Sequence, residues 1–246
     1  MKKRAQLTLI IIIGLILVLS AVFFIYINYQ KKIKLQQETP KNIEKLSSLN
    51  SYIEHCIDNT AKNAIIKLGK QGRLFPPIFI ESSTKKITYF YYQGQGYFPE
   101  SLAVLAQELS IYIKNNLDYC IDDFSLFYYE IEHDPDNIEI ISRINKRDIT
   151  VDVKYPVNAK MQETEMTLSE FSVTRRAGLY DIYELSKEIY KKTKQDPEWI
   201  DIEFLSRQPY KIRLIKAGEK TLIYEITDEN MFEESYVYRF AMKYNG

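Results

Sequence analysis

The feature that most constrains this chain is an uncharged apolar run close to its start, Leu7–Ile27. At about 1.5 Å per helical residue, a helix of this run spans about 30 Å, the thickness of the hydrocarbon core of a bilayer. A cleaved secretory signal has a shorter apolar core followed by small residues at the cut, whereas bulky residues occupy that place here, from Phe23 to Tyr26. The run therefore predicts a retained transmembrane helix in contact with the lipid bilayer.

The residues before this run carry a second signal. Lys2–Arg4 are basic, Ala5 and Gln6 follow, and the apolar run then begins. This start resembles the class III signal of archaeal type IV pilin-like single-pass membrane proteins, and also the start of uncharacterised anchored proteins of small-genome archaea. The resemblance implies that a prepilin-type peptidase cuts between Ala5 and Gln6 and leaves the helix on the mature protein. The alternative is an uncleaved signal anchor.

The resemblance breaks at one position. The fifth residue after the implied cut is Ile10, where major pilins usually carry a Glu that helps subunits find their register in a filament. The departure puts filament formation in question.

The chain divides by composition into five segments. Pro40 interrupts any helix that continues from the membrane segment. A change from helical to alternating apolar patterns falls near Phe124. The predicted segments are a basic leader (1–6), the transmembrane helix (7–27), a juxtamembrane linker (28–41), a mainly helical part (42–123) and an antiparallel β-rich part with one helix (124–246).

Apolar spacing predicts the secondary structure of the last two segments. Steps of three and four from Ile43 to Leu68, from Leu102 to Leu117 and from Leu179 to Tyr190 predict three amphipathic helices. The predicted strands are Ile87–Tyr92, Phe124–Glu132, Ile138–Ile144, Ile149–Tyr155, Glu165–Thr174, Lys211–Lys216, Thr221–Thr227 and Tyr236–Lys243. The three predicted strands between Phe124 and Tyr155 are expected to form a meander. Helices grouped before mainly antiparallel strands predict an α+β fold.

The cysteine content is two, Cys56 and Cys120, each late in a predicted helix. Packing of the two apolar stripes against each other would bring the thiols together. If the domain is outside the cell, a disulfide is expected, since oxidising compartments let it persist. Two unpaired buried thiols acting as small apolar groups are the alternative.

Lysines flank the apolar run on both sides, so the positive-inside count is almost tied and does not fix the orientation in the membrane. The cysteine pair and the signal-like start favour a cytoplasmic N-terminus and an extracytoplasmic domain. Lys+Arg and Asp+Glu both number 33, so charge gives no case for nucleic-acid binding.

Motifs for catalysis, cofactors or metals are weak. No phosphate-binding glycine loop and no His-Glu-x-x-His sequence occurs. His133 follows a strand and precedes an Asp-Pro turn, where we expect it to be solvated. A cation site at Asp118, Asp122 and Asp123, and an anion site at Arg175 and Arg176, are weaker alternatives to a capped helix end and a surface turn. We therefore predict no catalytic, cofactor-binding or metal-ligating residue.

These features favour a non-catalytic cell-surface protein anchored in the membrane and of pilin-like origin. It would be structural or adhesive, or a minor component of a surface assembly with other surface or pilus subunits. An extracytoplasmic ligand-binding or accessory domain tethered to a membrane complex is the alternative. An anchored hydrolase is a third reading that no motif supports.

Overall fold

The computed structural model describes residues 19, 20, 22, 23, 26, 44–82, 85–161, 164–196, 200–229 and 235–244. Contacts divide the chain into two compact units, Met1–Leu49 and Asn50–Gly246. The predicted leader, the linker and most of the predicted membrane segment lie outside the described residues. Five residues of that segment are described and are helical: Leu19, Ser20, Val22, Phe23 and Tyr26. Among the described residues, no helix combines the length and the apolar character needed to cross a bilayer.

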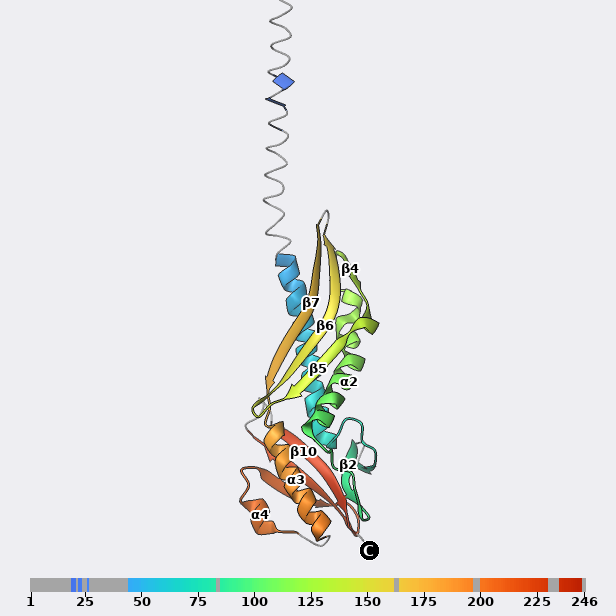
Figure 1. Cartoon of the computed structure of the whole chain (residues 1–246), viewed down its shortest axis with the longest axis vertical. Coiled ribbons are helices and arrows are strands. Elements are labelled where there is room, and N and C mark those ends of the chain that lie inside the picture. The colour runs from blue at the N-terminus through green and yellow to red at the C-terminus, as the bar shows by residue number, and fades with distance from the viewer. Residues whose placement is uncertain are drawn as a thin grey trace, which may run out of the picture. The chain divides into compact units, whose positions relative to one another are not determined.

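The second unit is α+β, as predicted. Residues 44–71 are helical, and the stretch 50–71 that belongs to the second unit is called helix 50–71 below. The other helices are α2 (Leu102–Ile121), α3 (Leu179–Gln195) and the short α4 (Ile202–Ser206), with 3-10 turns at Asp122–Phe124 and Pro135–Asn137. Figure 1 shows helix 50–71 and α2 running side by side along one of two sheets.

Helix 50–71 is held in place by its predicted apolar stripe. Ile53, Ile57 and Leu68 are fully buried, which confirms the helical spacing. Gly72 ends the helix at φ +77, a left-handed position that favours glycine. Gly69 lies inside the helix, where an added Cβ would be 2.6 Å from the carbonyl oxygen of Val237. Its role is therefore to allow close approach of a strand.

The first sheet joins the two ends of the second unit. It contains β1 (Phe79–Ser82), β2 (Lys85–Tyr92), β3 (Gln95–Gly96), β8 (Lys211–Lys216), β9 (Thr221–Asp228) and β10 (Tyr236–Lys243). The strand order is β1-β2-β10-β9-β8, with β3 paired to β2, and only the β2–β10 pair is parallel. The predicted boundary at residues 123 and 124 is thus one of composition, because this sheet takes strands from both sides of it.

Stacked aromatic rings fill one face of the first sheet. Phe240 lies in the middle, with its ring centroid 4.7 Å from that of Phe90 and 5.1 Å from that of Tyr224. Phe98 packs edge-on against Phe90 and stacks on Tyr190 of α3. Helix α3 therefore covers this face, as Figure 1 shows.

The second sheet is built around one long strand. It contains β4 (Glu130–His133), β5 (Glu139–Ile144), β6 (Asp148–Met161) and β7 (Thr164–Arg176). Both β4 and β5 pair with β6, at Val157–Lys160 and at Ile149–Lys154, while β7 pairs with β6 along its whole length. The predicted meander is therefore wrong in its first step, since β4 and β5 lie end to end along one side of β6, separated by a 3-10 turn.

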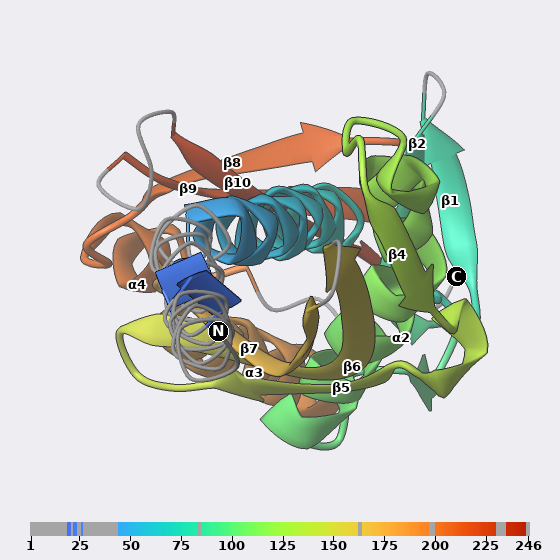
Figure 2. The same ribbon diagram turned by 90° about the horizontal axis from the view of Figure 1, so that it is seen from above.

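Strand β6 shows why the second sheet has one buried face. Its side chains alternate between buried and solvent-facing over the whole strand, and the alternation predicted for Ile149–Tyr155 is confirmed. Figure 2 shows that helix 50–71 passes between the strands of the first sheet and those of the second. Arg175 of β7 donates a hydrogen bond to Asp58 of this helix, and the Tyr236 hydroxyl of β10 donates one to its Ile65 carbonyl oxygen.

Candidate functional site

The two cysteines lie at disulfide distance. Their sulfur atoms are 2.18 Å apart and their Cα atoms 5.5 Å apart, so the bond joins helix 50–71 to the last turn of α2. Tyr52 supports the same junction, because its hydroxyl donates hydrogen bonds to the carbonyl oxygens of Cys120 and Ile121. The helical stripes thus bring the thiols together as expected. Ala5 and Gln6, the expected processing site, lie outside the described residues.

The expectation of a solvated His133 is wrong. The side chain is 7% exposed, and its ring lies edge-on against Phe124. Nδ1 is 2.6 Å from the Tyr155 hydroxyl and Nε2 is 2.8 Å from an Asp123 carboxylate oxygen. The burial of His133 could not be predicted from the local sequence, because the residues that cover its ring, Phe124 and Tyr155, come from other segments of the chain.

This Asp–His–Tyr chain has the appearance of an acid–base relay. Tyr155 is fully buried, however, and burial, with a smaller contribution from nearby carboxylates such as Asp118, raises the pKa of its phenol well above the usual range. No outside molecule reaches a phenol oxygen enclosed in this way. The hydrogen bonds instead fix the backbone at Asp122, Asp123 and Phe124, three successive residues with positive φ that would be strained without such support.

The alternative cation site at the end of α2 has a structural explanation. Asp122 is the C-terminal cap of α2, and its carboxylate accepts a hydrogen bond from the Ser125 hydroxyl. Asp123 bonds to His133. In the part of the chain that the structure describes, no group of three His, Cys, Asp or Glu side chains is placed to hold a metal ion.

The burial of two glutamates, Glu108 and Glu225, was not predicted from the sequence. Glu108 of α2 accepts hydrogen bonds from the Arg73 guanidinium and from the backbone N–H of Leu74. Glu225 of β9 lies between Arg213 and Arg239, at 2.6 and 2.7 Å. Each carboxylate is compensated by cations from neighbouring elements, as buried charges must be. Their only sequence signal was a charge inside an apolar run.

The arginine pair divides between two roles. Arg175 binds the carboxylate of Asp58 at 2.5 Å and the carbonyl oxygen of the same residue, so it fastens β7 to helix 50–71. Arg176 lines a hollow of about 370 Å³ together with Lys146 and Arg147. Asp181 and Asp228 line the same hollow, which reduces its attraction for an anion. The structure thus separates two residues that the sequence placed together.

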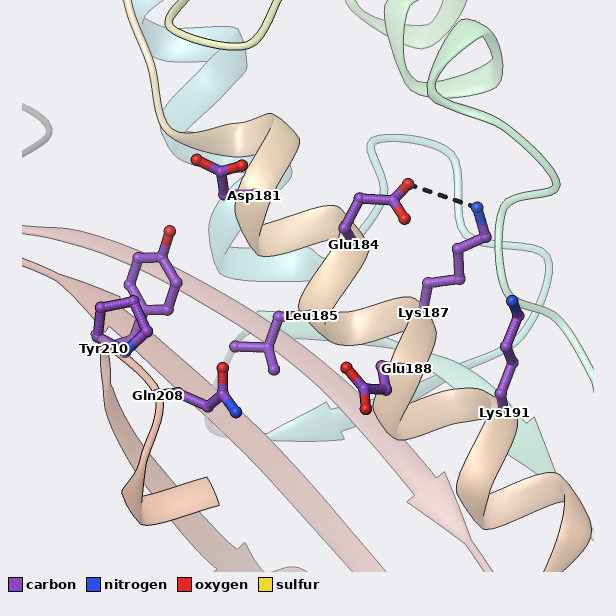
Figure 3. Close-up of a pocket in the computed structure, with 9 residues that line it drawn as sticks. Asp181, Glu184, Leu185, Lys187, Glu188, Lys191, Gln208 and Tyr210 are labelled. Carbon is purple, nitrogen blue, oxygen red and sulfur yellow. Dashed lines mark hydrogen bonds and ion pairs between the residues drawn. The ribbon is translucent and has the colours of Figure 1, made fainter. Parts of the chain in front are cut away.

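A larger groove, of about 520 Å³, lies beside α3. Figure 3 shows its residues: α3 contributes both acidic and basic side chains, and Gln208 and Tyr210 lie on the opposite wall. Glu184 and Lys187 form an ion pair at 3.4 Å. Burial, with smaller effects of two aspartates, raises the pKa of Tyr210. The groove offers charges of both signs and one phenol. Its only sequence signal was the charged face of the predicted helix.

Comparison with known proteins adds no relative. No family model, no curated protein and no solved structure matches this chain.

Proposed function

We propose that this chain is a non-catalytic cell-surface protein anchored by Leu7–Ile27, of pilin-like origin. It would serve as a structural or adhesive component, or as a minor component of a surface assembly. The observation that carries the proposal is the cysteine pair at bonding distance between helix 50–71 and α2. Disulfides persist in extracytoplasmic compartments, which supports an outward-facing domain behind a basic, cytoplasmic leader.

The use of polar groups in the second unit also supports this proposal. Glu108, Glu225 and His133 are groups that enzymes often employ, yet each has its polar atoms engaged in contacts that join elements of the fold. A residue committed to such contacts serves the rigidity of the domain. Rigidity suits a structural or adhesive subunit exposed outside the cell.

One mass measurement tests processing and oxidation together. Intact protein purified from membranes should have the mass of a chain that begins at Gln6. Reduction of the disulfide should raise that mass by two hydrogen atoms. A chain beginning at Met1, with Cys56 and Cys120 labelled by a thiol reagent from the cytoplasmic side, would overturn both the topology and the proposed origin. Copurification with other surface or pilus subunits is expected for the assembly component.

The groove beside α3 favours a second candidate, a tethered ligand-binding or accessory domain. Its walls carry Lys187 and Lys191 as well as Asp181 and Glu184, so a zwitterionic or mixed-charge ligand fits its chemistry. A receptor of this kind would keep its leader and remain a monomer. The mass and the oligomeric state of the purified chain therefore separate the two candidates.

A further inference from the structure

Strand β7 is a long sheet edge with one side open. It has 13 residues, which at about 3.4 Å per residue correspond to about 44 Å of strand. Within the described residues its only strand partner is β6, and in Figure 1 it forms the outer border of the second sheet. An edge of this length is a template for pairing with another chain.

Two common protections of such an edge are absent from β7. Proteins commonly place lysines or a proline on exposed edges to prevent pairing, yet the sequence TEMTLSEFSVTRR contains neither. Met166, Leu168 and Val173 point to the covered face and remain half-buried. Apolar side chains left partly open along an edge that lacks lysine and proline indicate that something covers them.

An irregularity in the sheet gives β7 an unusual symmetry. The register with β6 shifts between Lys154 and Val157, and on β7 two neighbouring residues, Ser169 and Glu170, are both exposed. On each side of this point the alternation resumes. The inward residues are Met166 and Leu168 before it, and Phe171 and Val173 after it. The outward residues are Glu165, Thr167, Ser172 and Thr174. The pattern therefore reads the same from both directions.

Only one antiparallel self-pairing matches this pattern throughout. Residues directly opposite each other in an antiparallel pair lie on the same face. With an axis between Ser169 and Glu170, Leu168 lies opposite the partner's Phe171, and Met166 lies opposite the partner's Val173. Shifting the register by one residue in either direction places Leu168 against an outward side chain of the partner. The palindromic pattern thus selects a single register.

We propose that β7 pairs antiparallel with β7 of a second copy of this chain, about a two-fold axis between Ser169 and Glu170, so that the second sheets of two copies become one continuous sheet. Outward pairs agree with this register, since Thr167 lies opposite the partner's Ser172. Glu165 lies diagonal to the partner's Arg176, within reach of an ion pair. Two-fold pairing is isologous and closes as a dimer. The inference goes beyond the proposed function, because it concerns pairing of the folded unit and neither its anchoring nor its processing; such a dimer argues against the monomeric receptor candidate.

Cysteine cross-linking tests both the pairing and its register. In the double variant Thr167→Cys/Ser172→Cys of the full chain, each new thiol faces one on the second copy at about 5 Å between Cβ atoms. Mild oxidation in native membranes should give a covalent dimer that reductant reverses. In either single variant the two new thiols lie five residues apart along the paired strands, at about 17 Å, and no dimer should form.

A second substitution tests the edge itself. Leu168→Lys in the double-cysteine background places an inward charge on the edge, the device that blocks pairing in natural sheets, and should reduce cross-linking about tenfold. The matched control is Ile141→Lys, since Ile141 is exposed on β5 at the other side of the sheet and should leave the dimer unchanged. Circular dichroism of the purified variants checks that both fold. Absence of dimer in the double variant, equal dimer in a single variant, or no effect of Leu168→Lys would each refute the proposed pairing.

Discussion

Reduction of the disulfide should lower the free energy of unfolding by an amount that depends on the length of the loop that the bond closes. Cys56 and Cys120 are separated by 64 positions. In the chain-entropy model, closing a loop of this length removes about 14 cal/mol/K from the unfolded ensemble, or about 4 kcal/mol at 25 °C. Domains are commonly stable by only about 5–15 kcal/mol. The bond therefore supplies a large part of the free energy of unfolding.

The assay is urea unfolding of the full chain in a mild detergent, followed by far-ultraviolet circular dichroism, with and without reductant. For a slope of about 2 kcal/mol per molar urea, the midpoint should fall by about 2 M on reduction. The double variant Cys56→Ala/Cys120→Ala is the control, because its midpoint should not respond to reductant. An unchanged midpoint for the reduced wild type would show that helix 50–71 and α2 are held together without the loop constraint.

Three further predictions concern single side chains. Glu108→Ala should lower the free energy of unfolding by about 3–5 kcal/mol, because it leaves the partly buried Arg73 guanidinium and the buried backbone N–H of Leu74 without their partner; urea unfolding measures the loss. Gly69→Ala should destabilise by about 1–3 kcal/mol, since the new Cβ would lie 2.6 Å from the Val237 carbonyl oxygen; thermal unfolding measures the shift. Tyr236→Phe should make the free energy of unfolding fall less steeply with pH above pH 10, and urea midpoints over a pH series measure this slope. Burial raises the pKa of the Tyr236 phenol from its ordinary value of 10.0, so above that pH the unfolded chain releases a proton that the folded chain keeps. Unfolding is then favoured by about 1.4 kcal/mol per pH unit for each such group, while the contribution is fully retained below pH 10.

Matched substitutions separate these effects from general sensitivity. Glu203→Ala removes the partner of Arg207 in an ion pair whose side chains are both 73% exposed, and should stay within about 1 kcal/mol of wild type. Asn63→Ala lies on the exposed side of helix 50–71 and should stabilise by about 0.5 kcal/mol through helix propensity. If Glu108→Ala cost no more than Glu203→Ala, or if Gly69→Ala also stabilised, the buried contacts described above would not carry the energy assigned to them. A wild-type slope above pH 10 in Tyr236→Phe would contradict the effect of burial.

The sequence predicted best where one local rule decided the structure. Strands β8 and β10 have the predicted bounds, and β9 extends one residue further, because turn residues such as Gly218 delimit short alternating runs. Helix α3 was found from its apolar spacing. The expected pair, Cys56 and Cys120, was also readable, since both residues continue a helical stripe.

The sequence predicted poorly where distant contacts overrode local preference. Phe124–Glu132 was expected to form a strand, but Phe124 is in a 3-10 turn with φ 54, held there by Asp123 and His133. Strand β6 extends through Pro156, at which a predicted strand would stop, because β7 pairs with it on both sides of the shift. Glu108 gave no hint of its partner, Arg73, which comes from another element. Such contacts form only in the assembled fold and cannot be recognised from a short stretch of sequence.

The parallel pairing of β2 with β10 has a consequence for synthesis of the chain. Ala241 of β10 lies beside Tyr89 of β2, so the strand that fills the position between β2 and β9 is synthesised after both of them. Until it arrives, Phe90 lacks its stacking neighbour Phe240, and the first sheet has a gap at its centre. Contacts between residues so far apart slow folding, and the unfinished sheet exposes apolar surface to aggregation. A nascent chain truncated before Tyr236 should therefore need a chaperone, and synthesis of β10 should be the event that releases it.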